Sequence, residues 1–186
     1  MNEQKQIGQL HAVVIQNLPE LAPDQRQTLI SNPAMVQKFL LGLLELLKLV
    51  FKLQSAIDRD MTGWKCLEPV DAGEGEFELV LEEFLKPADN GFLGGEEMVK
   101  RGREQGANSG LRHLEAILRQ QDKIPVEMRQ FYLVSTEVWQ APSDLSRDVW
   151  SLYWSGKSWV LNYDWLSYTF DSSCRFVRPR KYQKQS

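Results

Sequence analysis

Residues 149–163 read VWSLYWSGKSWVLNY. Large apolar side chains recur at every second position on both sides of a short polar turn, Ser155-Gly156-Lys157. Period-two alternation around a glycine-containing turn is typical of a β-hairpin, so we expect strands at 149–154 and 158–163. One face of this hairpin carries Trp150, Leu152 and Trp154 from the first arm and Trp159, Leu161 and Tyr163 from the second.

Further strands are indicated on both sides of the hairpin. In Glu76–Glu82 the apolar Phe77, Leu79 and Leu81 alternate with glutamates, the pattern of a strand with one solvated face. Segments 131–139 and 174–177 complete the set, and two helices are expected at 95–105 and 108–121. The order predicts an α+β domain at 58–186, an aromatic-rich antiparallel sheet packed with two helices.

Residues 1–57 are expected to form a helical extension. Asn32-Pro33 resembles a helix start, and the helix that follows is predicted to run to about residue 54. Its segment 39–51, FLLGLLELLKLVF, is apolar nearly all round but contains Glu45 and Lys48. A membrane span needs about 20 apolar residues, so we expect no span. Burial on several sides, or pairing with a protein partner or a second copy, is the expected role of Leu43, Leu47 and Phe51.

No secretory signal is apparent at the start of the sequence, so we expect a cytoplasmic protein whose thiols, Cys66 and Cys174, stay reduced. The net charge of −3 is unevenly distributed. Residues 61–100 hold ten acidic and three basic side chains, whereas residues 141–186 hold four acidic and seven basic ones.

No motif for catalysis, metal binding or a cofactor is found, and none of these is expected. His11 and His113 lie about a hundred residues apart and read as ordinary helix-surface or helix-flank residues. The glycine-rich stretch before the helix at 95 leads into Glu96 and Glu97, which would repel a phosphate. The acidic segment 71–89 lacks the ligand spacing of a calcium loop.

The C-terminal aromatic residues leave three interpretations open. Rings at alternating strand positions are first of all core material. They could also form a partner-binding surface, for which Trp154 and Trp159 are the candidates. Stacking on nucleic-acid bases is the third interpretation, supported by a basic C-terminal stretch without acidic residues. That stretch contains Arg175, Arg178, Arg180, Lys181 and Lys184 and is expected to be mostly a solvated terminus.

Several short motifs occur in an order that resembles a group of uncharacterised bacterial proteins from candidate-phylum genomes. The resemblance covers chiefly residues 94–180. Its motifs are Gly95-Glu96-Glu97-Met98-Val99-Lys100-Arg101, Ile124-Pro125, Tyr132-Leu133-Val134, Thr136, Val138-Trp139, Arg147, Leu152-Tyr153-Trp154-x-Gly156-x-x-Trp159, Trp165-Leu166 and Arg178-Pro179. Members of the group often carry a glycine-containing turn where this chain has Ser135-Thr136-Glu137. The resemblance implies a coherent domain and no activity, substrate or cofactor.

The leading functional hypothesis is therefore a non-catalytic intracellular protein-interaction module. It rests on the apolar helix and on the lack of a convergent catalytic set. The alternative is a nucleic-acid-binding accessory protein that uses the basic C-terminal stretch and the sheet aromatics.

Overall fold

Residues 48–182 are described by the computed structural model of the chain. The chain divides into two units, Met1–Lys48 and Leu49–Ser186, and all described residues except Lys48 belong to the second. The helices predicted before residue 48, together with Leu43 and Leu47, lie outside the described residues. Lys184 lies outside them as well.

The described residues form nine strands, two α-helices and three short 3-10 helices. The strands are β1 (Val50–Lys52), β2 (Lys65–Glu68), β3 (Glu76–Glu82), β4 (Phe92–Gly94), β5 (Tyr132–Gln140), β6 (Arg147–Trp154), β7 (Trp159–Trp165), β8 (Thr169–Asp171) and β9 (Cys174–Lys181). The α-helices are α4 (Gly95–Glu104) and α5 (Leu111–Arg119). The 3-10 helices are η1 (Pro87–Asp89), η2 (Gln121–Lys123) and η3 (Val126–Gln130).

Seven strands build one sheet in the order β1-β3-β9-β5-β6-β7, with β2 paired to the second half of β5. Strands β4 and β8 form a separate small sheet. The predicted α+β class is confirmed, but a wholly antiparallel sheet is wrong, because β5 and β9 run parallel. The chain reaches β9 through the small sheet and not through a hairpin, so nothing forces it to run antiparallel to β5.

The central hairpin and the acidic strand are confirmed. Strands β6 and β7 pair with Trp150 opposite Tyr163, and Gly156 has φ +92° in the turn between them. Strand β3 has the predicted bounds, with Phe77 and Leu79 buried. Strand β2 has no counterpart among the strands predicted from the sequence.

Strand β1 lies where the sequence predicts the end of a helix, and that prediction is wrong for residues 50–52. Phe51 and Leu53 are buried while Lys52 is exposed, which is the period of a strand. Because a leucine-rich run with a helical pattern precedes β1, the change from a helical period to a period of two is not apparent in the sequence. Phe51 pairs with Phe77 of β3, and the two rings stack with centroids 5.9 Å apart. A partner could reach Phe51 only if β1 moved.

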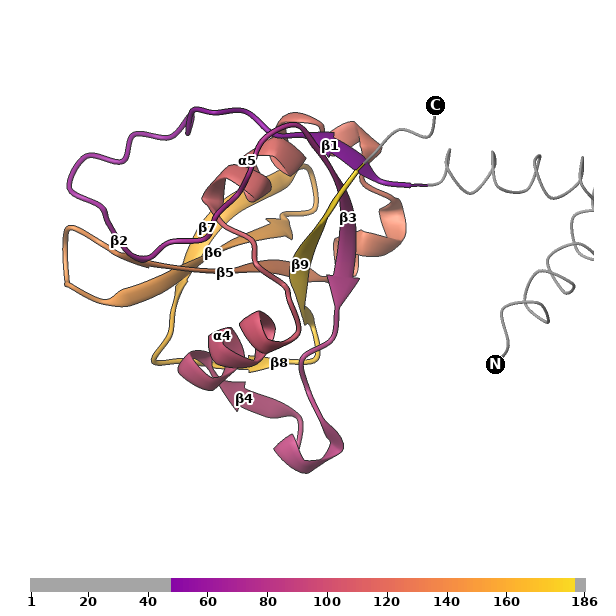
Figure 1. Ribbon diagram of the computed structural model, residues 1–186. Coiled ribbons are helices and arrows are strands. Elements are labelled where there is room, and N and C mark those ends of the chain that lie inside the picture. The colour runs from indigo at the N-terminus through magenta and orange to yellow at the C-terminus, as the bar shows by residue number, and fades with distance from the viewer. Residues whose placement is uncertain (1–47, 183–186) are drawn as a thin grey trace, which may run out of the picture. The chain divides into compact units, whose positions relative to one another are not determined.

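A hydrophobic core lies on each face of the large sheet, and Figure 1 shows α5 on one side with α4 and the small sheet on the other. The face toward α5, which we call the α5 face, buries Leu133, Trp150, Leu152, Leu111, Leu114 and Ile117. The opposite α4 face buries Val134, Val149, Phe176, Met98, Val99 and Phe170. A Cβ on Gly102 would lie 2.7 Å from the Phe176 ring, so glycine lets α4 rest directly on β9.

Two polar residues of α5 are buried, which corrects the expectation that His113 lies on the helix surface. His113 is 2% exposed, and its Nδ1 accepts the backbone N–H of Gly110 at 3.2 Å. The carboxylate of Glu115 accepts the backbone N–H groups of Asp58 and Arg59 at 2.9 and 3.1 Å. Both side chains therefore organise backbone at the helix and beside it.

Candidate binding site

The basic C-terminal stretch is a strand inside the sheet, so the expectation of a solvated terminus is wrong for Arg175 and Arg178, which are half-buried, whereas Arg180 and Lys181 are exposed. These residues belong to β9, between β3 and β5. Arg178 Nη1 donates to Glu82 Oε1 at 2.7 Å, and Arg175 Nη2 donates to Glu83 Oε1 at 2.9 Å. The acidic segment next to β9 therefore neutralises part of its charge.

Most tryptophans of the hairpin are core residues. Trp150 is fully buried, and Trp159 is 4% exposed. Trp154 is half-buried: its ring lies 6.1 Å from that of Trp159, and the guanidinium of Arg129 covers it at 3.9 Å. The predicted partner-binding pair, Trp154 and Trp159, thus packs at the edge of the α5 face, and a role in binding stays a prediction.

Two further ring pairs lie near the start of β5, the end of β6 and the end of β7. We call Tyr153, Tyr132, Tyr168 and Trp165 the aromatic strip. Tyr132 and Tyr153 stack with centroids 5.3 Å apart and planes at 20°, and Trp165 lies 5.1 Å from Tyr168. Tyr168, Tyr132 and Trp165 are 56%, 42% and 39% exposed, respectively.

Tyr153 has this position because the alternation of the hairpin has two faces. Pairing places Ser151 opposite Asn162 and Val149 opposite Asp164, on the side away from the buried tryptophans. Helix α4 and the small sheet cover Val149 but leave the end of β6 and the start of β5 open. The uncovered part of the α4 face is therefore polar and aromatic.

One ring of each pair lines a pocket of about 290 Å³, which we call the acidic pocket. Tyr132 and Tyr168 line it, together with the carboxyl groups of Asp164 and Asp171. Of the described residues, those that line it include no basic side chain. Its remaining lining residues are Val134, Thr169, Phe170, Ser173 and Cys174.

The two carboxyl groups of the acidic pocket differ in environment. Burial raises the pKa of Asp164, although Ser151 Oγ donates to its Oδ2 at 2.5 Å. Hydrogen bonds from the hydroxyl and the backbone N–H of Ser173 lower the pKa of Asp171. The pKa of Asp171 is thus lowered and that of Asp164 raised, and a cationic neighbour would favour the ionised form of both groups.

Neither thiol is prepared for nucleophilic chemistry. Burial raises the pKa of Cys174, with Asp171 and Asp164 adding to the effect. Burial, followed by the charge of Glu137, raises the pKa of Cys66 to about 11. Because the thiolate is the reactive form, these raised pKa values make both thiols less reactive than an ordinary cysteine.

Within residues 48–182, no group of three or more His, Cys, Asp or Glu side chains could hold a metal ion. The same part of the chain contains no helix long and apolar enough to cross a membrane. The arrangement at the acidic pocket supports binding of a positively charged group.

The sequence indicates an aromatic-rich C-terminal segment but does not bring the residues of the pocket together. Tyr132, Tyr168 and Phe170 belong to this segment, whereas Asp164 was not singled out. The available signal was the second face of the hairpin, where Ser151, Asn162 and Asp164 alternate with the buried rings. Comparison with protein-family models, curated proteins and solved structures gives no significant match.

Proposed function

We propose that the described domain is a non-catalytic protein-interaction module of the cytoplasm that accepts a lysine or arginine side chain of its partner in the acidic pocket. The observation that carries the proposal is the pairing of exposed tyrosine rings with two carboxyl groups in one pocket. Cations are attracted to the faces of aromatic rings and to carboxylates, and aromatic cages use this to bind ammonium groups. The free thiols, Cys66 and Cys174, agree with a reducing compartment.

The size and position of the pocket support a single side chain as occupant. A volume of about 290 Å³ is at the small end for a ligand site, and it opens beside exposed rings. Tyrosine and tryptophan at the rim supply contact area for the backbone on either side of that side chain, as they do at many interfaces. Arg175, the residue after Cys174 of the pocket, is already held by the carbonyls of Ser172 and Cys174 and by Glu83.

The test compares two synthetic peptides that differ only in one side chain, lysine or its uncharged isostere norleucine. Titration against the protein labelled with ¹⁵N is expected to shift the resonances of Tyr132, Asp164 and Tyr168 with the lysine peptide alone. Tyr132→Ala and Tyr168→Ala should each weaken binding about two- to tenfold. Asp164→Asn should weaken it as well, because the carboxylate is lost while the shape stays.

Two variants serve as matched controls. Asp122→Asn removes one carboxylate from an exposed position in η2, and Phe92→Ala removes an exposed ring of β4 that does not line the pocket. Both should bind the lysine peptide like the parent protein. Equal shifts with the norleucine peptide, or equal losses in the control variants, would show that the acidic pocket does not recognise charge.

A further inference from the structure

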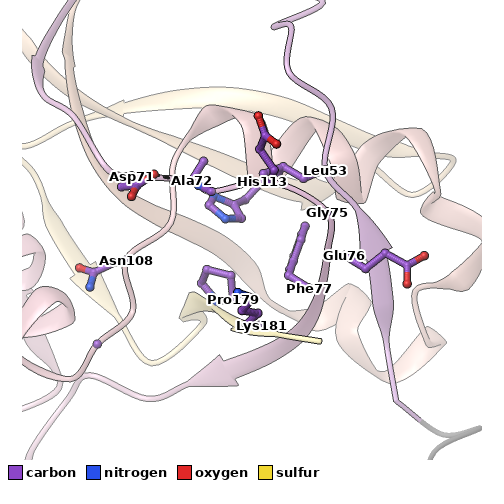
Figure 2. A pocket seen from close by; sticks show the side chains of 13 residues that line it. Leu53, Asp71, Ala72, Gly75, Glu76, Phe77, Asn108, His113, Pro179 and Lys181 are labelled. Atoms are coloured by element: carbon purple, nitrogen blue, oxygen red, sulfur yellow. Dashed lines mark hydrogen bonds between the residues drawn. The ribbon is translucent and has the colours of Figure 1, made fainter. Parts of the chain in front are cut away.

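A second pocket, of about 310 Å³, lies on the α5 side of the sheet, and we call it the His113 pocket. Its walls come from the loop 71–75, from the start of β3, from α5 and from the end of β9. Figure 2 shows the imidazole of His113 among Ala72, Phe77 and Pro179, while the side chain of Glu76 points away. The acidic pocket lies on the opposite face, so the two sites are independent.

His113 presents a fixed hydrogen-bond donor to this pocket. Nδ1 accepts the Gly110 N–H at 3.2 Å, so the proton of the neutral imidazole is on Nε2. The ring stands edge-on to Phe77, with centroids 5.0 Å apart and planes at 80°. Among the described residues, Nε2 has no hydrogen-bond partner, although His113 is only 2% exposed. Nε2 is not among the fully buried polar atoms without a partner, so it is accessible in the pocket, where an acceptor of a ligand can take its N–H.

The other walls are apolar near His113 and polar at the rim. Leu53 and Phe77 are 7% and 5% exposed, and Ala72 and Pro179 are half-buried. The amide of Asn108 and the ammonium group of Lys181 lie at the exposed rim, as do the carboxylates of Asp71 and Glu74. Charges of both signs at the rim, over an apolar interior, favour a ligand without net charge.

The loop that closes the pocket is held in place from both sides. Leu53 N–H donates to the Gly75 carbonyl at 2.8 Å, and Gly73 N–H donates to Asp71 Oδ1 at 3.0 Å. Arg112 Nη2 donates to the Gly73 carbonyl at 3.4 Å, and its Nε donates to the Gln54 carbonyl at 2.9 Å. The pocket is therefore largely formed before any ligand arrives, as small-molecule sites usually are.

We propose that the His113 pocket binds an uncharged small molecule that offers a carbonyl or similar acceptor to Nε2–H of His113 and a planar apolar body to Phe77 and Pro179. The apolar interior disfavours an anion or a cation, and the Nε2–H donor of His113 orients the acceptor. Asn108 at the rim can satisfy a second polar group of the ligand. This site needs no residue of the acidic pocket, and its test is separate.

Three probes of nearly the same shape and different charge test the proposal: benzamide, benzoate and benzamidinium. Molecules of this size bind with a Kd on the order of millimolar at best. Benzamide is expected to bind most tightly and to shift the ¹⁵Nε2 resonance of His113 and the ring resonances of Phe77. Benzoate or benzamidinium binding tighter than benzamide would overturn the proposal, as would the absence of any shift at His113.

Two variants separate binding from folding. His113→Asn keeps an acceptor near the Gly110 N–H but removes the Nε2 donor, and it should weaken benzamide binding at least about tenfold. Ala72→Leu leaves His113 intact and fills the pocket from the loop, and it should abolish binding with the spectrum otherwise unchanged. If the Ala72→Leu variant still binds benzamide, the ligand binds outside the His113 pocket and the proposal is wrong.

Discussion

His113 shows at the scale of one residue how a polar group is kept in a core. Its Nδ1 satisfies a backbone N–H at the start of α5, and its ring contacts Phe77. Burial, followed by the charge of Arg112, lowers its pKa from 6.5 to about 4. The other charged groups around it are Lys181 of β9 and the carboxylates of Asp71 and Glu74.

Stability should therefore fall as the pH falls from about 6.5 to about 4. The unfolded chain takes up a proton on this histidine in that range, and the folded chain does not, so acid favours unfolding. The shift corresponds to a loss on the order of 3 kcal/mol in the free energy of unfolding. Urea unfolding at a series of pH values measures it. His113→Asn should flatten this part of the profile; a slope unchanged in the variant would assign it to other groups, since His11 is present in both proteins.

The raised pKa of Asp164 predicts how binding at the acidic pocket depends on pH. Its pKa lies above 3.8 because the carboxyl group is buried, so it takes up a proton at a higher pH than ordinary aspartates do. Taken alone, this raised pKa makes the fold more stable as the pH falls. Affinity for the lysine peptide should show the opposite trend and decrease through the same range. Peptide titrations between pH 7 and pH 4 check this, and Asp164→Asn should bind weakly with little pH dependence.

At the scale of elements, Glu137 connects β5 to the start of α5. Strand β5 shifts register between Val134 and Val138, and Glu137 lies in that interruption. Its Oε2 accepts the Leu111 N–H at 3.0 Å and the indole N–H of Trp139 at 2.7 Å. A carboxylate at a helix N-terminus satisfies an unpaired N–H and interacts favourably with the helix dipole.

Gly110 makes this cap possible, and its replacement should be costly. A Cβ at Gly110 would lie 2.6 Å from Glu137 Oε2, whereas a Cβ at Gly94 would meet no atom within 4 Å. Both glycines are N-cap residues, of α5 and α4, so the two alanine variants differ mainly in the clash. Gly110→Ala should lower the free energy of unfolding by about 1–3 kcal/mol more than Gly94→Ala. Equal losses in chemical denaturation would show that Glu137 moves aside freely.

The elements that sequence reasoning located are those whose pattern is local. Strand β3 and the hairpin of β6 and β7 show a clean period of two, and glycines mark the ends of α4. Strand β1 was not predicted because Phe51 and Lys52 follow a leucine-rich run whose sequence pattern is helical. The interruption in β5 was not predictable either: Ser135 and Thr136 are fully buried, and the backbone N–H groups of Thr136 and Glu137 both donate to the Ser109 carbonyl.

At the scale of the whole molecule, the position of β9 could not be predicted from the chain. Its sequence has alternating arginines that resemble a solvated end, and only the tertiary pairing places Arg178 opposite Val80 and beside Glu82. The same limit applies to the acidic pocket. Tyr132 begins β5, Asp164 belongs to β7 and Tyr168 to the turn after it, and β8 of the small sheet supplies Thr169, Phe170 and Asp171 to the same pocket.

The position of β9 also decides how a role for its charges can be tested. Strand β9 pairs with β3 over six residue pairs, from Phe176 to Lys181. A chain that ends after Phe176 loses all of these residues except Phe176, including the fully buried Val177. We expect this truncated protein to be unfolded, with loss of the dispersed NMR spectrum, so any loss of binding in it would say nothing about charge. The double variant Arg178→Gln and Arg180→Gln keeps the strand. The ion pairs with Glu82 that this variant loses are partly exposed and stabilise the fold by only about 0–1 kcal/mol each, so the variant should stay folded.

The double variant therefore separates the two functional hypotheses. If β9 binds nucleic acid, removing two arginines should weaken binding to single-stranded DNA or RNA and lower the salt slope by about 1–2 units. Because Glu82 and Glu83 already pair with Arg178 and Arg175, and the chain carries a net charge of −3, we expect no such effect. Measured from about 50 to 200 mM salt, both proteins should show at most weak binding that disappears with salt. Tight binding at physiological salt that the variant loses would favour a nucleic-acid partner over the lysine or arginine side chain proposed for the acidic pocket.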